Sequence, residues 1–101
     1  MSKTTSVLAE RIEQKRDEIR AIVEANRASN PRVFGSVLHG TDDEQSDIDL
    51  LIDADPDASL FDLGAIQYDL SELLGTRVDV LTPGDLPVRF RDRVIAESRS
   101  I

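Results

Sequence analysis

The stretch that decides the fold of this chain is VFGSVLHGTDDEQSDIDLLID, residues 33–53. Its apolar pattern predicts a buried central strand, and this strand carries two carboxylates. An apolar lead-in is followed by a Gly-Ser pair, a polar loop, and then Asp47 and Asp49. Side chains two residues apart on a strand point to the same face. Like charges held side by side in a protein are costly unless a cation or a proton compensates them. The stretch therefore predicts a metal site on a central strand.

Helices and strands alternate on either side of this stretch. Apolar spacing and the positions of Gly, Pro and capping residues predict helix 4–28, strand 32–35, a short helix from Ser36, strand 47–52, helix 60–74, strand 77–81 and helix 88–97. The alternation predicts an α/β (α+β) fold, with a small mixed sheet flanked by helices. A crossover through helix 60–74 would make strands 47–52 and 77–81 parallel. We also expect Phe61 and Tyr68 of that helix to lie in the core.

Length and composition bound the class of protein. With 101 residues and 40% apolar content, the chain predicts one domain spanning 1–101, in which helix 4–28 is scaffold. No run approaches the roughly 18 apolar residues of a membrane span, and the N-terminus lacks the apolar core of a signal peptide. No cysteine is present, which excludes disulfides and cysteine-based zinc sites or catalysis. We expect a cytoplasmic protein without a membrane partner.

Charge is unevenly distributed along the chain. The formal net charge is −8, and residues 33–76 contain eleven acidic residues and no Lys or Arg. Such a span repels a phosphate backbone, so direct nucleic-acid binding is not expected. Within it, Asp42, Asp43 and Glu44 are interpreted as a solvated acidic surface. Any phosphate bound to this part of the chain is expected to arrive with divalent cations.

A third carboxylate, Asp79, lies on the predicted strand 77–81. Neighbouring strands lie about 4.8 Å apart, so Asp79 would come close to Asp47 and Asp49 if the two strands pair. Oxygen ligands without His or Cys beside them favour Mg²⁺ or Mn²⁺. Two such ions about 4 Å apart would clamp the attacking and leaving oxygens of a phosphoryl displacement. The alternative is an exposed Asp79 paired with Arg77.

The Gly-Ser pair is suited to holding a phosphate. Gly35 allows the backbone to approach a phosphate closely, and the Ser36 hydroxyl and the amides that follow it can bind its oxygens. A phosphate-binding loop of the GxxxxGK[ST] type would need Lys where the chain has Thr41. An EF-hand loop starting at Asp47 has Leu51 in place of an oxygen ligand. Neither of these simpler motifs fits.

The run GSVLHGTDDEQSDIDLLID resembles the signature of the DNA polymerase β-like nucleotidyltransferase superfamily, in which Gly-Ser is followed by ten residues and then Asp-x-Asp. Ten residues, 37–46, separate Ser36 from Asp47. The resemblance extends from about Pro31 to the end of the sequence. The chain also resembles the minimal nucleotidyltransferase (MNT) subfamily. The residues that match this subfamily are Gly40, Ser46, Leu50 and the segment RVDVLTP at 77–83.

The resemblance implies roles for matching residues. Asp47 and Asp49 would bind metal ions, and Asp79 would complete the triad as base or metal ligand. The nucleotide triphosphate would be held by Gly35, Ser36, His39 and Ser46. His39 stands where the subfamily usually has Arg, and neutral His stabilises phosphate less than Arg does. The resemblance therefore leaves the rate or the nucleotide affinity open at this position.

The resemblance also implies a reaction and a partner. Many MNT proteins are antitoxins paired with a HEPN-domain RNase toxin, and some transfer AMP from ATP to a tyrosine of that toxin. The resemblance thus implies a protein adenylyltransferase that uses ATP and two Mg²⁺ or Mn²⁺ ions. Its role would be that of the antitoxin of a type VII toxin–antitoxin pair. It would form a hetero-oligomer with the toxin or a homo-oligomer. Two alternatives stay open. The chain could neutralise its partner by binding alone, or transfer a nucleotidyl group to a small molecule.

Overall fold

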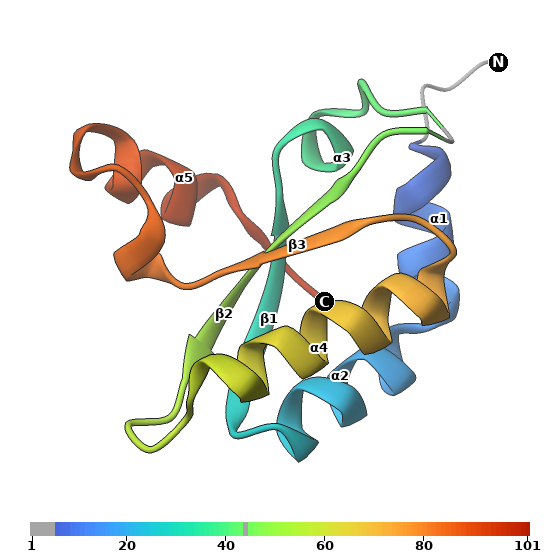
Figure 1. Ribbon diagram of the computed structural model, residues 1–101. Helices are drawn as coiled ribbons and strands as arrows, with labels where there is room; N and C mark the ends of the chain where they lie inside the picture. Colours follow the sequence, from blue (N-terminus) through green and yellow to red (C-terminus); the bar gives the residue numbers. More distant parts are fainter. Residues whose placement is uncertain (1–5, 44) are drawn as a thin grey trace, which may run out of the picture.

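A four-stranded mixed sheet in the order β3-β2-β1-β4 organises the computed structural model, which describes residues 6–43 and 45–101. Its strands are β1 (Ala28–Phe34), β2 (Ile48–Ala54), β3 (Val78–Leu81) and β4 (Arg99–Ser100). β1 is antiparallel to β2 and to β4, whereas β2 and β3 are parallel (Figure 1). The predicted fold class and the predicted parallel pair are confirmed.

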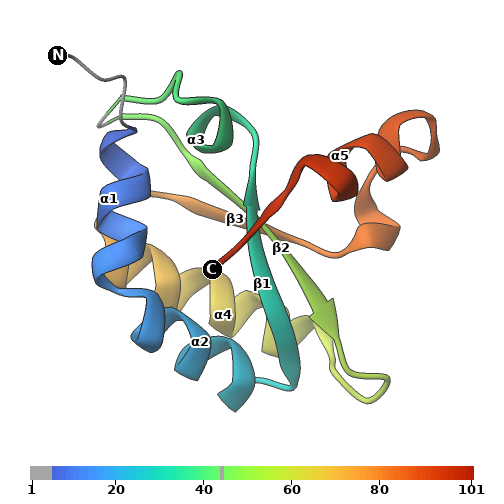
Figure 2. The same ribbon diagram turned by 180° about the vertical axis from the view of Figure 1, so that it is seen from behind.

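Helices occupy both sides of this sheet. Their bounds are α1 (Val7–Gln14), α2 (Arg16–Ala25), α3 (Ser36–His39), α4 (Leu60–Leu74), the 3₁₀ turns η1 (Pro83–Asp85) and η2 (Val88–Phe90), and α5 (Arg91–Glu97). No helix in the described ranges is long and apolar enough to cross a membrane. Figures 1 and 2 show α1, α2 and α4 gathered together, with α5 standing apart from them.

The strand alternation of β2 separates two faces of the sheet. Ile48, Leu50 and Ile52 are fully buried in a core cluster to which α1, α2 and α4 contribute their apolar sides. Asp49 and Leu51 point to the opposite face. Leu51 is nevertheless fully buried, and the segment after β3 passes near β2 on this side. β2 is therefore covered on both faces at its centre, as its continuous apolar run predicts.

α4 also protects the outer edge of β3. The amide of Val78 donates to Ser71 Oγ at 3.0 Å, and the amide of Val80 donates to Gln67 Oε1 at 3.0 Å. Both acceptors are side chains of the crossover helix that connects β2 to β3. α4 therefore fixes the strand that carries Asp79 through hydrogen bonds as well as through apolar packing.

The prediction of one N-terminal helix over 4–28 is wrong. Residues 4 and 5 lie outside the described residues, α1 ends at Gln14, and α2 begins at Arg16. Lys15 between them has φ −114° and ψ 15°, which breaks the helical path. The break lets each half pack its own apolar pair, because Leu8 and Ile12 on α1 and Ile19 and Val23 on α2 are all buried.

Other differences affect bounds and burial. β1 begins at Ala28 rather than at residue 32, so the end of the predicted scaffold helix belongs to the sheet. The predicted helix 88–97 is a 3₁₀ turn followed by α5, and β4 was not predicted. The prediction that Phe61 and Tyr68 are core residues is wrong, since they are 89% and 66% exposed. Ile66, Leu70 and Leu74 form the buried side of that helix instead.

Candidate active site

Asp49 is the centre of the candidate site. It lies on β2 in register with Asp79 on β3 and with Phe34 on β1, while Asp47 directly precedes β2. Burial raises the pKa of Asp49, and the negative charges of Asp79 and then Asp47 raise it further. The predicted pairing of the two carboxylate-bearing strands is therefore present. The three acidic groups affect one another electrostatically, as expected for a cation site.

Gly35 is required where β1 ends beside Asp49. Its φ of 77° lies in a region that L side chains rarely adopt. A Cβ built on Gly35 would also collide with Asp49 Oδ2. Ser36 follows at once as the first residue of α3, which ends at Gly40 in the left-handed conformation. The Gly-Ser pair is thus placed against the central carboxylate, and this close approach leaves no room for a side chain.

Asp79 is paired with a cation. Its Oδ1 accepts a hydrogen bond from Arg77 Nε at 3.1 Å, and the Arg77 side chain is largely exposed. Residues 77 and 79 share a face of the strand end, so this pair lies on the same side as the carboxylates. The sequence alternative for Asp79 and its place beside Asp49 are therefore both present. The Arg77 side chain is 69% exposed and that of Asp79 is 29% exposed, so solvent weakens this ion pair on the Arg77 side.

His39 and Ser46 lie at the borders of the site. His39 ends α3 with an exposed side chain whose Nε2 lies 3.7 Å from Glu97 Oε1 of α5. The Ser46 hydroxyl accepts from the Asp43 amide at 3.0 Å and lies 3.3 Å from Asp43 Oδ1. Thr76 Oγ1 donates to the Ser46 carbonyl at 3.0 Å. Ser46 therefore stabilises the loop before β2, and a nucleotide contact stays a prediction for both residues.

The acidic loop before β2 is not wholly solvated. Asp42 is partly buried, and its Oδ2 accepts the Leu8 amide at 3.0 Å, which satisfies a free donor at the start of α1. The interpretation of Asp42 as solvated surface is therefore wrong, whereas Asp43 is exposed as expected and Glu44 lies outside the described residues. This hydrogen bond could not be predicted from the sequence, because its donor, the Leu8 amide, lies 34 positions away from Asp42.

A second interaction that the sequence did not reveal lies farther along β2. Asp53 accepts hydrogen bonds from Arg32 of β1 at 3.1 and 3.3 Å, and from Asn30 at 3.0 Å. These contacts hold the pKa of Asp53 below its usual range, with the Arg32 hydrogen bond as the largest cause. Asp53 shares the strand face of Asp49 but is neutralised within the chain. Substitution of Asp53 can therefore be compared with substitution of Asp47 or Asp49, because Asp53 is paired with Arg32.

The donor chemistry fits a hard divalent cation. Across residues 6–43 and 45–101, no three His, Cys, Asp or Glu side chains are grouped closely enough to hold one ion. Asp47, Asp49 and Asp79 nevertheless supply only oxygen donors, and burial, followed by repulsion from Asp79 and Asp47, raises the pKa of Asp49. A cation would relieve that repulsion. Mg²⁺ and Mn²⁺ take few carboxylates and complete their shells with phosphate oxygens and water, so the residues fit an ion that arrives with a triphosphate.

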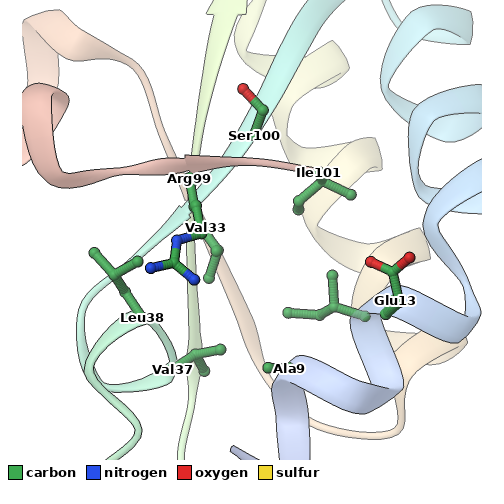
Figure 3. A pocket seen from close by; sticks show the side chains of 9 residues that line it. Ala9, Glu13, Val33, Val37, Leu38, Arg99, Ser100 and Ile101 are labelled. Carbon is green, nitrogen blue, oxygen red and sulfur yellow. The ribbon is translucent and has the colours of Figure 1, made fainter.

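A cavity of about 190 Å³ lies elsewhere, between α1, α3, β1 and β4. Figure 3 shows its wall of apolar side chains, including Val33 and Val37, with Glu13 and Arg99 beside them. None of the predicted site residues lines it. The cavity therefore lies apart from the candidate carboxylate site.

Comparison with known proteins gives related sequences. The chain is 39% identical over 66 residues to a Methanocaldococcus jannaschii protein named as a candidate protein adenylyltransferase, covering 65% of this chain and 71% of that protein. It is 35% identical over 65 residues to a protein adenylyltransferase of Thermococcus cleftensis, covering 64% of this chain and 66% of the relative. Adenylyl transfer is thus the activity for which both relatives are named.

Solved structures share the fold. A candidate minimal nucleotidyltransferase superposes with a TM-score of 0.78 at 33% identity, covering 91% of this chain and 92% of the other. A toxin–antitoxin structure with AMP-PNP superposes with a TM-score of 0.69, covering 83% of this chain and 69% of that one. Its identity of 20% supports a likeness of fold alone. The model of the nucleotidyltransferase domain matches residues 10–101, which confirms the family predicted from Gly-Ser and Asp-x-Asp. This chain is therefore a member of the nucleotidyltransferase-domain family of enzymes.

Proposed function

We propose that this chain is a metal-dependent protein adenylyltransferase that transfers AMP from ATP to a tyrosine hydroxyl of a HEPN-type toxin, as the antitoxin of a type VII pair. The observation that carries the proposal is the register of Asp49 with Asp79 beside Gly35, with Asp47 at the start of the same strand. The names of the relatives support AMP as the transferred group and a protein as the acceptor. We place the reaction in the cytoplasm, where ATP is available.

Two Mg²⁺ or Mn²⁺ ions are expected at Asp47, Asp49 and Asp79. When bound, they supply positive charge that offsets the triphosphate. Gly35 brings the backbone of the Gly-Ser turn against Asp49. The Ser36 hydroxyl that follows can donate a hydrogen bond to a phosphate oxygen. Residues 33–76 contain no Lys or Arg. The positive charge needed to hold the triphosphate would therefore come from the metal ions that bind together with it.

The transfer itself is a displacement at the α-phosphorus of ATP. The acceptor oxygen forms a bond to this phosphorus while the bond to the oxygen that bridges the α- and β-phosphates breaks, and pyrophosphate leaves. Asp79 takes the proton of the acceptor hydroxyl after its carboxylate separates from Arg77. Positioning and charge neutralisation account for most of the rate enhancement in reactions of this type.

A second candidate function is neutralisation of the partner by binding alone. The Arg77–Asp79 pair favours it, because this contact engages the third carboxylate. No feature near the carboxylates favours a small-molecule acceptor, since the described cavity lies away from them.

Labelled ATP separates the two candidates. The purified chain, incubated with Mg²⁺, α-labelled ATP and a purified HEPN-type toxin, is expected to give a labelled toxin. Asp47→Asn should reduce labelling about 100-fold or more, because charge stabilisation of the transition state is lost. Asp53→Asn is the matched control, because Asp53 shares the strand face but pairs with Arg32. If Asp47→Asn neutralises the toxin as well as the wild type, binding alone is the function.

A further inference from the structure

The outward side of α4 carries apolar residues that the described chain leaves in water. Leu60 and Phe61 are 84% and 89% exposed, and Tyr68 is 66% exposed. Phe61, Gly64 and Tyr68 follow one another at intervals of three and four residues, so they line one face of the helix. The opposite side of α4 packs against the core, where Ile66, Leu70 and Leu74 are buried. We call the outward side the Phe61–Gly64–Tyr68 face. Exposed aromatic side chains two helical turns apart on one face, with small or apolar residues between them, are a composition found at interaction sites.

Gly64 has no role within the described chain. It lies inside a 15-residue helix, where glycine is less favourable than alanine. Its backbone is not in the positive-φ region, and no heavy atom beyond its helical neighbours lies within 4 Å of a Cβ built on it. Neither a turn nor a close internal contact therefore requires it. A glycine between two exposed rings does, however, allow the backbone of another molecule to approach the helix.

Charge selects the kind of molecule that can cover this face. α4 contains Asp62, Asp69 and Glu72 and has no Lys, Arg or His. If two copies of the chain met through this face, Asp69 and Glu72 would oppose their own counterparts, and such like-charge contacts are unfavourable. A complementary surface has an apolar groove with Lys or Arg at its edges. A protein with a basic surface fits this description, and a second copy of this chain, with its formal net charge of −8, does not.

The face is separated from the candidate active site by the sheet. α4 buries Ile66 and Leu70 in the cluster that contains Ile48 and Leu50. Those strand residues point away from the side of Asp49, because side chains alternate along a strand. A protein bound to α4 would therefore leave the carboxylates accessible to ATP, so binding and transfer would use different surfaces.

We infer that the Phe61–Gly64–Tyr68 face docks against an apolar groove of a protein partner, and that Lys or Arg residues edge this groove. The identity of this partner as the toxin rests on the proposed function, whereas the location of the surface does not. Phe61 and Tyr68 fill the groove, and Gly64 lets the two backbones come close. Aromatic anchors of this kind dominate the affinity of protein interfaces.

Tyr68 offers a direct readout, because it is the one tyrosine in the 101-residue sequence. The full chain is labelled with 3-fluorotyrosine, and its single ¹⁹F resonance is followed while the fluorine-free toxin of the labelling assay is added. The resonance should shift on complex formation in the wild type and in Asp47→Asn. If the complex forms while the resonance stays unchanged, the face is not the docking surface. If the toxin does not bind the wild type, the assignment of the partner is wrong.

Substitutions test the energetics by calorimetric titration with the same toxin. The double variant Phe61→Ser/Tyr68→Ser should bind at least about 100-fold more weakly, since two exposed anchors are removed without loss of core. Val88→Ser is the matched control, because Val88 is also largely exposed but lies on η2. Equal affinity of the double variant and the wild type would overturn the inference, and so would a comparable loss in Val88→Ser.

Gly64→Ala separates docking from folding. Alanine favours the helix, so the melting temperature should rise by about 5 °C, whereas the affinity should fall by about tenfold because a methyl group enters the contact. Unchanged affinity would contradict the role of Gly64.

Sedimentation of the chain alone should give a monomer. If the chain forms dimers and Phe61→Ser abolishes them, a second copy occupies the face and the choice of partner is wrong. Transfer that persists in Asp47→Asn would refute the role of Asp47 in the reaction. A wild-type chain that binds the toxin but does not label it would refute the proposed function and leave the docking surface standing.

Discussion

Asp49 combines a cost to folding with the proposed catalytic role. Its side chain is partly buried between Asp79 and Asp47, which raises its pKa. A carboxyl group with a raised pKa in the folded state binds its proton more tightly there than in the unfolded chain. Its contribution to stability therefore falls as pH rises from the ordinary value of 3.8 through the folded value. At pH 7 the ionised group opposes folding unless a cation is bound.

Asp49→Asn should therefore stabilise the protein when divalent ions are removed by a chelator. We expect the free energy of unfolding at pH 7 to rise by less than about 1 kcal/mol, because solvent screens a half-exposed charge. The gain should shrink as pH falls into the range where wild-type Asp49 is protonated. Thermal unfolding between pH 4 and pH 7 measures it, with Asp55→Asn, at an exposed carboxylate, as control. A loss of stability in Asp49→Asn would contradict this account of the raised pKa.

Gly35 should tolerate no side chain. Gly35→Ala would strain a backbone with φ 77° and push against Asp49 Oδ2, so the free energy of unfolding should fall by about 1–3 kcal/mol. AMP transfer should fall about 100-fold, because displacement of a carboxylate misplaces the reacting groups. Chemical denaturation and labelled-ATP assays measure the two effects. The matched control is Gly84→Ala, whose added Cβ would meet only Thr82 Oγ1 at 3.9 Å.

Among the helices, α4 was predicted with its correct bounds because local residues mark both ends. Ser59 and Asp62 form a capping box at its start, and Gly75 adopts the left-handed conformation at its end. The N-terminal helix lacks such marks near Lys15, and its apolar spacing continues across the break, so the sequence predicted one helix. β4 has two residues, too few for an alternating pattern. Its pairing with β1 is a tertiary effect.

The candidate site was predictable for a related reason. The spacing of Asp47 and Asp49 within one strand is local, and the parallel crossover through α4 brings Asp79 opposite Asp49. The Asp42 contact with α1 was not predictable, because neither residue carries a local signal for the other. Burial of Phe61 and Tyr68 was wrongly predicted from apolar character alone, since periodicity does not distinguish a core face from a docking face.

The link between the acidic loop and α1 should contribute to stability. Asp42→Ala removes the acceptor for the Leu8 amide and should lower the free energy of unfolding by about 1 kcal/mol, as loss of a helix cap does. Urea denaturation at pH 7 measures the difference. Asp43→Ala is an unsuitable control because Asp43 organises its own loop, so the exposed Asp17 of α2 serves instead. Equal effects of Asp42→Ala and Asp17→Ala would show that the contact does not stabilise α1.

The candidate carboxylate site and the Phe61–Gly64–Tyr68 face of α4 lie on opposite sides of one sheet. Ligand binding to the native state raises its stability according to the ligand concentration. With Mg²⁺ and a non-hydrolysable ATP analogue at 100 times the dissociation constant, the free energy of unfolding should rise by about 2.7 kcal/mol. Differential scanning calorimetry measures this, and Asp47→Asn should lose the gain. A wild-type melting temperature unaffected by saturating Mg²⁺ and nucleotide would count decisively against the carboxylate site.

The contacts of α4 with the edge of β3 have a consequence for self-assembly. Ser71 and Gln67 occupy the two outward amides of β3 that another strand would need for pairing. At the other end of the sheet, β4 offers only two residues, Arg99 and Ser100. Short, charged or occupied edges prevent the addition of further strands. Concentrated solutions of this protein should therefore resist growth into cross-β fibrils, even though its central strand, with Leu50, Leu51 and Ile52 in succession, has an aggregation-prone composition.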